Sequence, residues 1–395
     1  MSRRRLICDV QKSGAPGPGV VDGGRVVSDD RPVGAAIVGT GWGLLTHAPA
    51  MRDAGIDVRW LVGRDRERAE ERAAAAGVHR ATVDLDEVLD DPAVDLVVVA
   101  TPPDTHAPLV IRAAEAGRHV MCEKPFAHSL DDAKRMRDAV RAAGVLGVVG
   151  HEFRFLGDRI ATREAVGSGL IGAPKLFTHT RLSSTLAGVG ATVPGWFGER
   201  AAFGGWFNAE VQHLIDEIRG LLGELASVTV LEQQVTERNW DVGDTFAAQF
   251  VTCAGAVGTI LSSVGTAGSG LSVQRISGTN GCIWTDPDGS IVVDDGSGRR
   301  VLAAAAPRDA AATDPTITDL VSTNTLSRAL SGASGMLREP TRVMYEAVRQ
   351  RILSGGNDPA AAGPAMFDDG VANTAVHMAM LRSMRSGGTE RIETV

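Results

Sequence analysis

Tyrosine is almost absent from this 395-residue chain, and cysteine and lysine are scarce. The single tyrosine is Tyr345, and Arg349 stands four residues later, so the Tyr-x-x-x-Lys pair of short-chain dehydrogenases is missing. The cysteines lie far apart, without a C-x-x-C pair or a histidine spacing suited to zinc. We therefore expect free thiols in a reducing cytoplasm and no metal site. The four cysteines are Cys8, Cys122, Cys253 and Cys282.

Long apolar runs and excess positive charge are also absent. No stretch approaches the roughly 20 apolar residues of a membrane-spanning helix, so we expect no membrane partner. The 48 Asp and Glu residues outnumber the 40 Lys and Arg residues, which gives a formal net charge of −8. Nucleic-acid-binding proteins usually carry a basic surface, so we expect no nucleic-acid partner either.

Only four of the basic residues are lysines. A desolvated lysine can release its proton near neutral pH, whereas arginine cannot. In a chain that uses arginine as its default cation, a retained lysine indicates chemistry that arginine cannot perform. The four are Lys12, Lys124, Lys134 and Lys175, and the position of Lys124 after a predicted strand makes it the first candidate.

Composition and periodicity divide the chain into three parts. Residues 1–32 are rich in Gly, Pro, Ser and Asp and show no periodicity, so we expect a disordered tail. Residues 33–150 alternate apolar strands with amphipathic helices, which predicts a doubly wound parallel sheet of the Rossmann type that binds a dinucleotide. The predicted strands are Gly34–Gly39, Asp57–Gly63, Val94–Ala100, His119–Glu123 and Val145–Val149, and the predicted helices are Leu44–Ala54, Arg66–Ala76, Pro108–Ala116 and Asp131–Ala142.

Residues 151–395 follow a different rhythm, with one helix and then consecutive strands separated by Gly- and Asp-rich turns. This pattern predicts an α/β domain with an open, mostly antiparallel sheet, which we expect to bind substrate and to mediate oligomerisation. We expect a loop over Asp294–Pro315 and closing helices that pack back on the first domain. The predicted helices are Gly157–Gly167, Arg338–Ser354 and Asp369–Arg385, and the predicted strands are Lys175–Arg181, Ala226–Val235, Thr245–Thr252, Ala256–Val264, Ser272–Ser277 and Gly281–Thr285.

The first strand runs into the turn Gly39-Thr40-Gly41-Trp42-Gly43. A G-x-G turn between a strand and a helix lets the backbone approach a pyrophosphate at the positive end of the helix dipole. Leu44 replaces the third glycine of the usual motif, so the strand before and the helix after carry the prediction. We therefore predict that Gly39, Gly41, Trp42 and Gly43 bind the dinucleotide.

The second strand ends at Arg64, where a site for NAD usually has an acid on the ribose hydroxyls. A guanidinium pairs with a 2′-phosphate, which favours NADP(H) over NAD(H). Asp65 follows directly and can still reach the ribose, so NAD(H) remains open.

Two further strand ends carry candidates for the same edge of the sheet, where doubly wound sheets bind ligands. Thr101-Pro102 follows the third predicted strand, and Glu123-Lys124-Pro125 follows the next. A lysine at this edge can polarise a carbonyl group or exchange a proton with an alcohol.

These segments together resemble the Gfo/Idh/MocA family of glucose-fructose oxidoreductase and inositol dehydrogenase. The resemblance covers nearly everything after residue 33. It rests on the G-x-G-W-G turn, Thr101-Pro102 with His106, Ala116-Gly117-Arg118-His119-Val120, Glu123-Lys124-Pro125, Gly150-His151-Glu152-Phe153-Arg154-Phe155, Gly204–Glu224 and Phe367-Asp368-Asp369-Gly370.

The resemblance implies a nicotinamide cofactor, a small-molecule substrate such as a sugar, polyol or cyclitol, and dimers or tetramers formed through the open sheet. It implies that Lys124 belongs to the catalytic centre and that Thr101, Pro102, His106 and Glu123 lie at the cofactor.

The chain departs from the family at the start of one helix. The family typically carries Asp-x-Gly-x-His, whereas this chain has Ala209 and Val211 at the first two positions and keeps His213. We predict His213 as a general acid or base, because a histidine near its ordinary pKa suits proton transfer at neutral pH. A purely structural His213, with Lys124 alone handling the proton, is the alternative.

Substrate-binding candidates follow the last strand of the first domain and surround a glycine-rich aromatic segment, Trp196–Phe207. Flat aromatic rings suit the C–H face of a sugar, although packing in a core explains them equally well. The candidates are Glu152, Arg154, Trp196, Trp206, Asn208 and Glu210.

The sequence therefore predicts an NAD(P)-dependent oxidoreductase that moves a hydride to or from a sugar, polyol, cyclitol or nucleotide sugar. Two alternatives keep the fold. One is a redox-assisted glycosidase or lyase with a tightly bound cofactor, and the other is a dinucleotide-binding regulator without enzymatic activity, because fold does not fix function.

Overall fold

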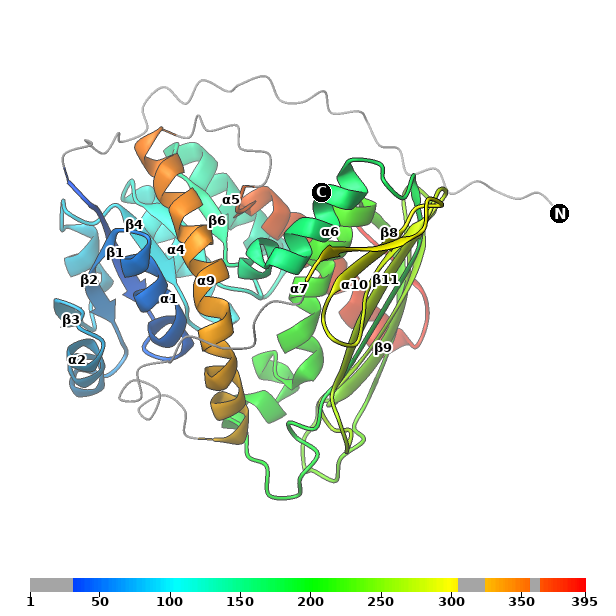
Figure 1. Ribbon diagram of the computed structural model, residues 1–395. Coiled ribbons are helices and arrows are strands. Elements are labelled where there is room, and N and C mark those ends of the chain that lie inside the picture. Colours follow the sequence, from blue (N-terminus) through cyan, green and yellow to red (C-terminus); the bar gives the residue numbers. More distant parts are fainter. Residues whose placement is uncertain (1–30, 305–323, 356–362) are drawn as a thin grey trace.

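The computed structural model describes residues 31–304, 324–355 and 363–395. Residues 1–30, most of the predicted tail, lie outside the described residues. The predicted fold class is confirmed: a parallel sheet is followed by a mostly antiparallel one, with helices on both. Figure 1 shows the two sheets at opposite sides of the molecule.

Within the described residues, the first sheet has seven strands in the order β15-β6-β5-β4-β1-β2-β3. All neighbouring strands are parallel except β15, which pairs antiparallel with β6. Helices on both faces bury strands that consist almost entirely of apolar residues. The strands are β1 (Val33–Val38), β2 (Ile56–Val62), β3 (Arg80–Thr82), β4 (Leu96–Val99), β5 (His119–Cys122), β6 (Gly147–Val149) and β15 (Ala365–Met366), and the helices are α1 (Trp42–Asp53), α2 (Arg66–Ala75), α3 (Leu85–Leu89), α4 (His106–Glu115) and α5 (Leu130–Ala143).

The second sheet has nine described strands in the order β14-β13-β12-β11-β7-β10-β9-β8-β16. Only β7 and β10 pair in parallel. Helices α6 (Gly157–Gly167), α7 (Gly205–Leu222) and α10 (Phe367–Ser386) lie on the side of this sheet that faces the first sheet (Figure 1). The strands are β7 (Pro174–Leu182), β8 (Leu225–Gln233), β9 (Thr245–Thr252), β10 (Val257–Ser263), β11 (Leu271–Gly278), β12 (Cys282–Thr285), β13 (Ile291–Asp294), β14 (Arg299–Ala303) and β16 (Glu390–Arg391).

Strand β14 lies where the sequence predicted only a loop, so that prediction was wrong for Arg299–Ala303 and for Asp294, the last residue of β13. The strand is mostly exposed, and ion pairs from Arg299 to Asp286 and from Arg300 to Asp295 anchor it. A strand held by charges shows no apolar alternation, which explains the miss. The rest of the predicted loop, from residue 305, lies outside the described residues.

Helix α9 (Thr325–Leu353) begins 13 residues before the predicted helix at Arg338. Asn324 caps it, accepting a hydrogen bond from the Ser327 backbone while the Ser327 hydroxyl accepts one from Asn324. The helix runs along α1 (Figure 1) and buries an apolar face in the core of the first sheet. That face consists of Met344, Tyr345, Val348 and Ile352.

Candidate functional site

The G-x-G turn has the geometry that a pyrophosphate requires. Gly39 has a φ of +121°, and a side chain there would lie 2.3 Å from the carbonyl oxygen of Ala100. Gly43 packs against the Ala100 side chain, whereas a side chain at Gly41 would meet nothing within 4 Å. No side chain caps the N-terminus of α1, so its first N–H groups and the open space above Gly41 fit an anionic group. The side chain of Trp42 lies outside those that the structure describes.

Arg72 supports this turn, and the sequence did not reveal it. Its guanidinium is buried and donates a hydrogen bond to the carbonyl oxygen of Thr40, between the two glycines. Only the folded structure brings α2 back over the turn, so no local motif signals the contact.

Arg64 and Asp65 are both exposed at the end of β2. The Asp65 carboxylate accepts a hydrogen bond of 2.8 Å from the backbone N–H of Arg68 and so caps α2. Asp65 is therefore engaged in the fold, while the Arg64 guanidinium extends from the strand end where the adenosine ribose binds in such domains.

His106 lies inside the protein and links the segments that follow β4 and β5. It is fully buried, and its ring nitrogens lie 2.8 Å from the Thr101 carbonyl oxygen and 3.1 Å from the Phe126 carbonyl oxygen. Burial lowers the pKa of His106. The imidazole thus ties the Thr101-Pro102 turn to the turn that contains Lys124, and its contact with the cofactor stays a prediction. Thr101 is half-buried and Pro102 is exposed.

Glu123 lies at the end of a buried hydrogen-bonded chain. The hydroxyl of Tyr345 lies 2.8 Å from His47 Nδ1, and His47 Nε2 lies 2.9 Å from the Glu123 carboxylate. The other carboxylate oxygen accepts a hydrogen bond from the backbone N–H of Lys124. Burial would raise the pKa of Glu123, but the hydrogen bond from His47 and the charge of Lys124 lower it to about 2. Glu123 is therefore ionised and orients the turn that bears Lys124.

A second carboxyl group, Glu152, follows the neighbouring strand β6 and interacts electrostatically with the same lysine. Strand β6 ends next to β5, and Gly150 is so close to Glu123 that a side chain at 150 would lie 2.8 Å from its carboxylate. Glu152 is only 6% exposed. Burial raises its pKa to about 7, and the charge of Glu123 adds to the rise while Lys124 opposes it.

His213 lies on α7, which packs on the second sheet. We call α7 the second wall of the candidate site and the ends of the strands of the first sheet its first wall. The His213 ring stacks on Phe153, with centroids 3.7 Å apart and planes 9° apart. Burial, followed by the positive charges of Lys124 and His151, holds the pKa of His213 well below its ordinary value. The expectation of a histidine near its ordinary pKa was wrong, because the ring is buried among positive charges and lacks an acidic partner. Its Nδ1 has no hydrogen-bond partner in the described part of the chain.

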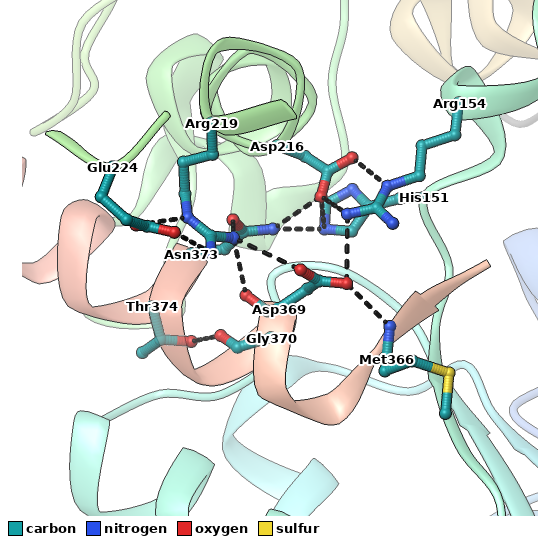
Figure 2. A network of polar contacts seen from close by, with 10 residues as sticks. All are labelled: His151, Arg154, Asp216, Arg219, Glu224, Met366, Asp369, Gly370, Asn373 and Thr374. Carbon is teal, nitrogen blue, oxygen red and sulfur yellow. Dashed lines mark hydrogen bonds and ion pairs between the residues drawn. The ribbon is translucent and has the colours of Figure 1, made fainter. Parts of the chain in front are cut away.

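The acidic residues around His213 on α7 belong to ion pairs. Glu210 lies 2.8 Å from Arg181. Asp216 accepts two hydrogen bonds of 2.7 Å from Arg154, which reaches Asp369 at 3.2 Å as well. Figure 2 shows that Arg154 and Asp216 belong to a network that joins η2 (Glu152–Phe155), α7 and α10. The other polar side chains of this network include His151, Asn373, Arg219 and Glu224.

Four of the predicted substrate-binding residues are buried, Trp206 and Asn208 as well as Glu152 and Glu210. Trp206 is 6% exposed, and its indole N–H donates to the Ser262 hydroxyl at 2.8 Å. Asn208 is buried and bonds to His377 at 2.7 Å. Both residues have partners in the core, and their contact with substrate stays a prediction, whereas Trp196 is 53% exposed and available to a ligand.

The stacked Phe153 and His213 both line a pocket of about 330 Å³. Its wall is rich in guanidinium groups and includes His151, Arg154, Arg159, Arg163, His213 and Arg351. In the described residues, no group of three or more His, Cys, Asp or Glu side chains is arranged to hold a metal ion. None of the described helices combines the length and apolar character needed to cross a membrane.

Two models of one protein family match the chain. The model described as "Oxidoreductase family, NAD-binding Rossmann fold" matches residues 33–151, and the model of the GFO/IDH/MocA C-terminal domain matches residues 160–284.

Curated relatives and solved structures agree with these matches. Levoglucosan dehydrogenase from Pseudarthrobacter phenanthrenivorans is 32% identical over 51% of this chain, and the match spans 50% of that protein. Inositol 2-dehydrogenase from Rubrobacter xylanophilus is 28% identical, over 93% of this chain and 95% of that protein. A structure of levoglucosan dehydrogenase with NADH and levoglucosan superposes with a TM-score of 0.76 at 21% identity, covering 92% of this chain and all of that one.

Proposed function

Because the chain belongs to the GFO/IDH/MocA oxidoreductase family, we propose that it is a nicotinamide-dependent dehydrogenase or reductase. Its substrate in this proposal is a sugar, polyol, cyclitol or nucleotide sugar, reacting at a hydroxyl or carbonyl group. The relatives named levoglucosan dehydrogenase and inositol 2-dehydrogenase support this class of substrate.

One observation carries the proposal. The uncapped N-terminus of α1 and the turn that bears Lys124 lie at the same carboxyl edge of the parallel sheet. An anion-binding helix end and an amine at one edge are what a dinucleotide and a reacting oxygen require. Gly39, Gly41, Trp42, Gly43, Thr101 and Pro102 would line the dinucleotide.

The residues around the substrate divide the work of binding and proton handling. When bound, a nicotinamide dinucleotide supplies the group that accepts or donates hydride. Lys124 holds the substrate oxygen and polarises its bond to carbon. His213, as a neutral imidazole, makes a hydrogen bond to the substrate, and its stacking on Phe153 fixes the plane of the ring. Trp196 offers an exposed indole to a ring of the substrate.

For the cofactor, the exposed Arg64 supports NADP(H), whereas the structurally similar levoglucosan dehydrogenase was solved with NADH. We propose that Arg64 binds the 2′-phosphate and that the chain uses NADP(H) more efficiently. The test compares kcat/KM with NADPH and NADH in the wild-type protein and in Arg64→Ala, with Arg66→Ala as control. Arg64→Ala should lower the preference for NADPH about tenfold. Equal use of NADH by both proteins would refute the assignment.

We also propose a homodimer or homotetramer formed through the outer face of the second sheet. Leu176, Val257, Leu261 and Leu271 are exposed on neighbouring strands of this face. Leu261→Asp should lower the mass measured by light scattering, whereas Val189→Asp on an exposed loop should not. The free thiols of Cys122, Cys253 and Cys282 support a reducing compartment such as the cytoplasm.

A single experiment tests the activity. One sample of the purified protein is denatured, and the nucleotide that it releases is identified. In a second, native sample, NAD(P)H absorbance is followed with sugars, keto-sugars, cyclitols and nucleotide sugars. Net oxidation or reduction of the nucleotide supports the proposal. Product formation with a retained nucleotide and no net change would instead establish a redox-assisted glycosidase or lyase.

A further inference from the structure

Two carboxyl groups, Glu123 and Glu152, follow the ends of the neighbouring strands β5 and β6, interact electrostatically with the lysine of the candidate site, and differ in environment. Glu123 receives hydrogen bonds from His47 and from the backbone of Lys124. Glu152 is equally buried, and among the described contacts its carboxyl group bonds to its own backbone N–H but to no other residue. The ionised form of Glu123 is thus stabilised more than that of Glu152, whose pKa rises through burial although the charge of Lys124 opposes the rise. When the pKa values of two neighbouring acids are separated in this way, one acid is ionised and the other keeps its proton.

The position of Glu152 connects the two walls of the site. It is the first residue of η2, directly after the end of β6, and the next residue, Phe153, stacks on His213. The charges that act on its carboxyl group come from Lys124, Glu123 and His47, and the Tyr345 hydroxyl on α9 lies in the same cluster. Within this cluster, Glu152 is the acid whose pKa of about 7 suits proton exchange at neutral pH.

On the opposite wall, α7 provides no group that can exchange a proton at neutral pH. His213 is neutral at neutral pH, and Glu210 and Asp216 are held in ion pairs. Residue 209, one helical turn before His213, is an exposed alanine. Glu217, the remaining acid of this helix, is paired with Arg159, so no carboxylate on α7 is free to take a proton from the site.

We propose that Glu152 is the proton-exchange partner of Lys124 and takes the place of the carboxylate that is missing at Ala209. The proposal rests on the oxidoreductase function proposed above. In the oxidation direction, the substrate C–H bond breaks and its hydride goes to the oxidised nicotinamide dinucleotide. The substrate O–H bond breaks as its proton passes to Lys124, while the Lys124 ammonium group passes one of its own protons to the Glu152 carboxylate. A carbonyl group forms, Lys124 keeps its charge, and Glu152 becomes a neutral acid.

Kinetics of Glu152→Gln test this exchange. For oxidation, wild-type kcat/KM should fall as the pH drops below about 7, because protonated Glu152 accepts no proton. Glu152→Gln should lower kcat/KM at least 100-fold at neutral pH and remove this dependence on pH. Glu164→Gln, an exposed change on α6, is the control and should match the wild type. A Glu152→Gln enzyme that keeps the wild-type pH profile would overturn the proposal.

A second measurement needs neither substrate nor cofactor. Infrared difference spectra of the free protein between pH 5 and pH 9 should contain the band of a carboxylic acid that titrates near neutral pH. The band should be lost in Glu152→Gln and kept in Glu152→Asp, which also guards against a variant that fails to fold. If the band persists in Glu152→Gln, the assignment is wrong. If the wild type has the band but oxidises no substrate of the panel, the proposed activity fails independently.

The third test adds the missing acid. Ala209→Asp in the Glu152→Gln background should recover at least tenfold in kcat/KM, because the exposed position has room for the side chain. A double variant no more active than Glu152→Gln would refute the claim that the two carboxylates are equivalent.

Discussion

The two walls of the candidate site are built in opposite ways. The wall from the first sheet holds ionisable groups that act on one another, from Tyr345 through His47 and Glu123 to Lys124 and Glu152. The wall from α7 holds a neutral imidazole, and its carboxylates are already paired with arginines. In the proposed mechanism, proton chemistry therefore belongs to the first wall, while the second provides shape and orientation.

Removal of the amine is the strongest way to break this comparison. Lys124→Ala should lower kcat/KM by about 10³-fold or more, because the variant loses the group that polarises the reacting oxygen. Lys134→Ala on α5 is the matched control and should keep full activity. If Lys124→Ala retains more than a tenth of wild-type activity, the first wall does not carry the proton chemistry.

The second wall should fail structurally instead. Asp216→Ala leaves the mostly buried guanidinium of Arg154 without its two short hydrogen bonds, which should cost about 3 kcal/mol in the free energy of unfolding. Asp138→Ala removes an exposed ion pair with Arg137 and should have a much smaller effect. Urea unfolding measures both values. Equal costs would mean that the network in Figure 2 is not a structural element.

Stability as a function of pH sharpens the comparison. The pKa of Glu152 rises from 4.5 in the unfolded chain to about 7 in the folded protein, so the folded state binds this proton more tightly. The stabilisation is complete below about pH 4.5 and is lost as the pH rises through 7. Glu152→Gln should therefore be more stable than the wild type at about pH 8, by roughly 1–3 kcal/mol, with little difference at about pH 4. A constant difference between these pH values would contradict the assignment.

The smallest effect is expected at His213. The pKa of His213 lies well below its ordinary value, so the ring stays neutral across the neutral range. His213→Gln keeps a hydrogen-bonding group and should lower kcat/KM about tenfold without moving the pH profile. A profile that loses its acidic limb in this variant would assign the proton to His213 and reverse the comparison.

The sequence predicted the parallel sheet well because its strands are continuous apolar runs. It missed β14, which ion pairs anchor, and placed the start of α9 late, because Asn324 and Ser327 begin that helix without an apolar stripe.

Within the site, Lys124 could be identified from the scarcity of lysine and from its position after a strand. The pKa values of Glu152 and His213 could not, since they depend on burial against residues distant in sequence. The burial of Trp206 and Asn208 could not be predicted for the same reason: the pattern does not distinguish a glycine-rich aromatic loop from the first turn of a core helix.

The last described segment joins both halves of the molecule, since β15 pairs with β6 in the first sheet and β16 pairs with β8 in the second. During synthesis the ribosome releases β6 and β8 long before these partners. Both strands keep an unpaired edge until the partners emerge. Tyr345 likewise reaches His47 only after almost 300 intervening residues have been made. The site beside Lys124 is therefore completed late in translation. A nascent chain halted before residue 345 already contains the dinucleotide turn, His47 and Glu123, but it lacks the Tyr345 hydroxyl that completes their hydrogen-bonded chain.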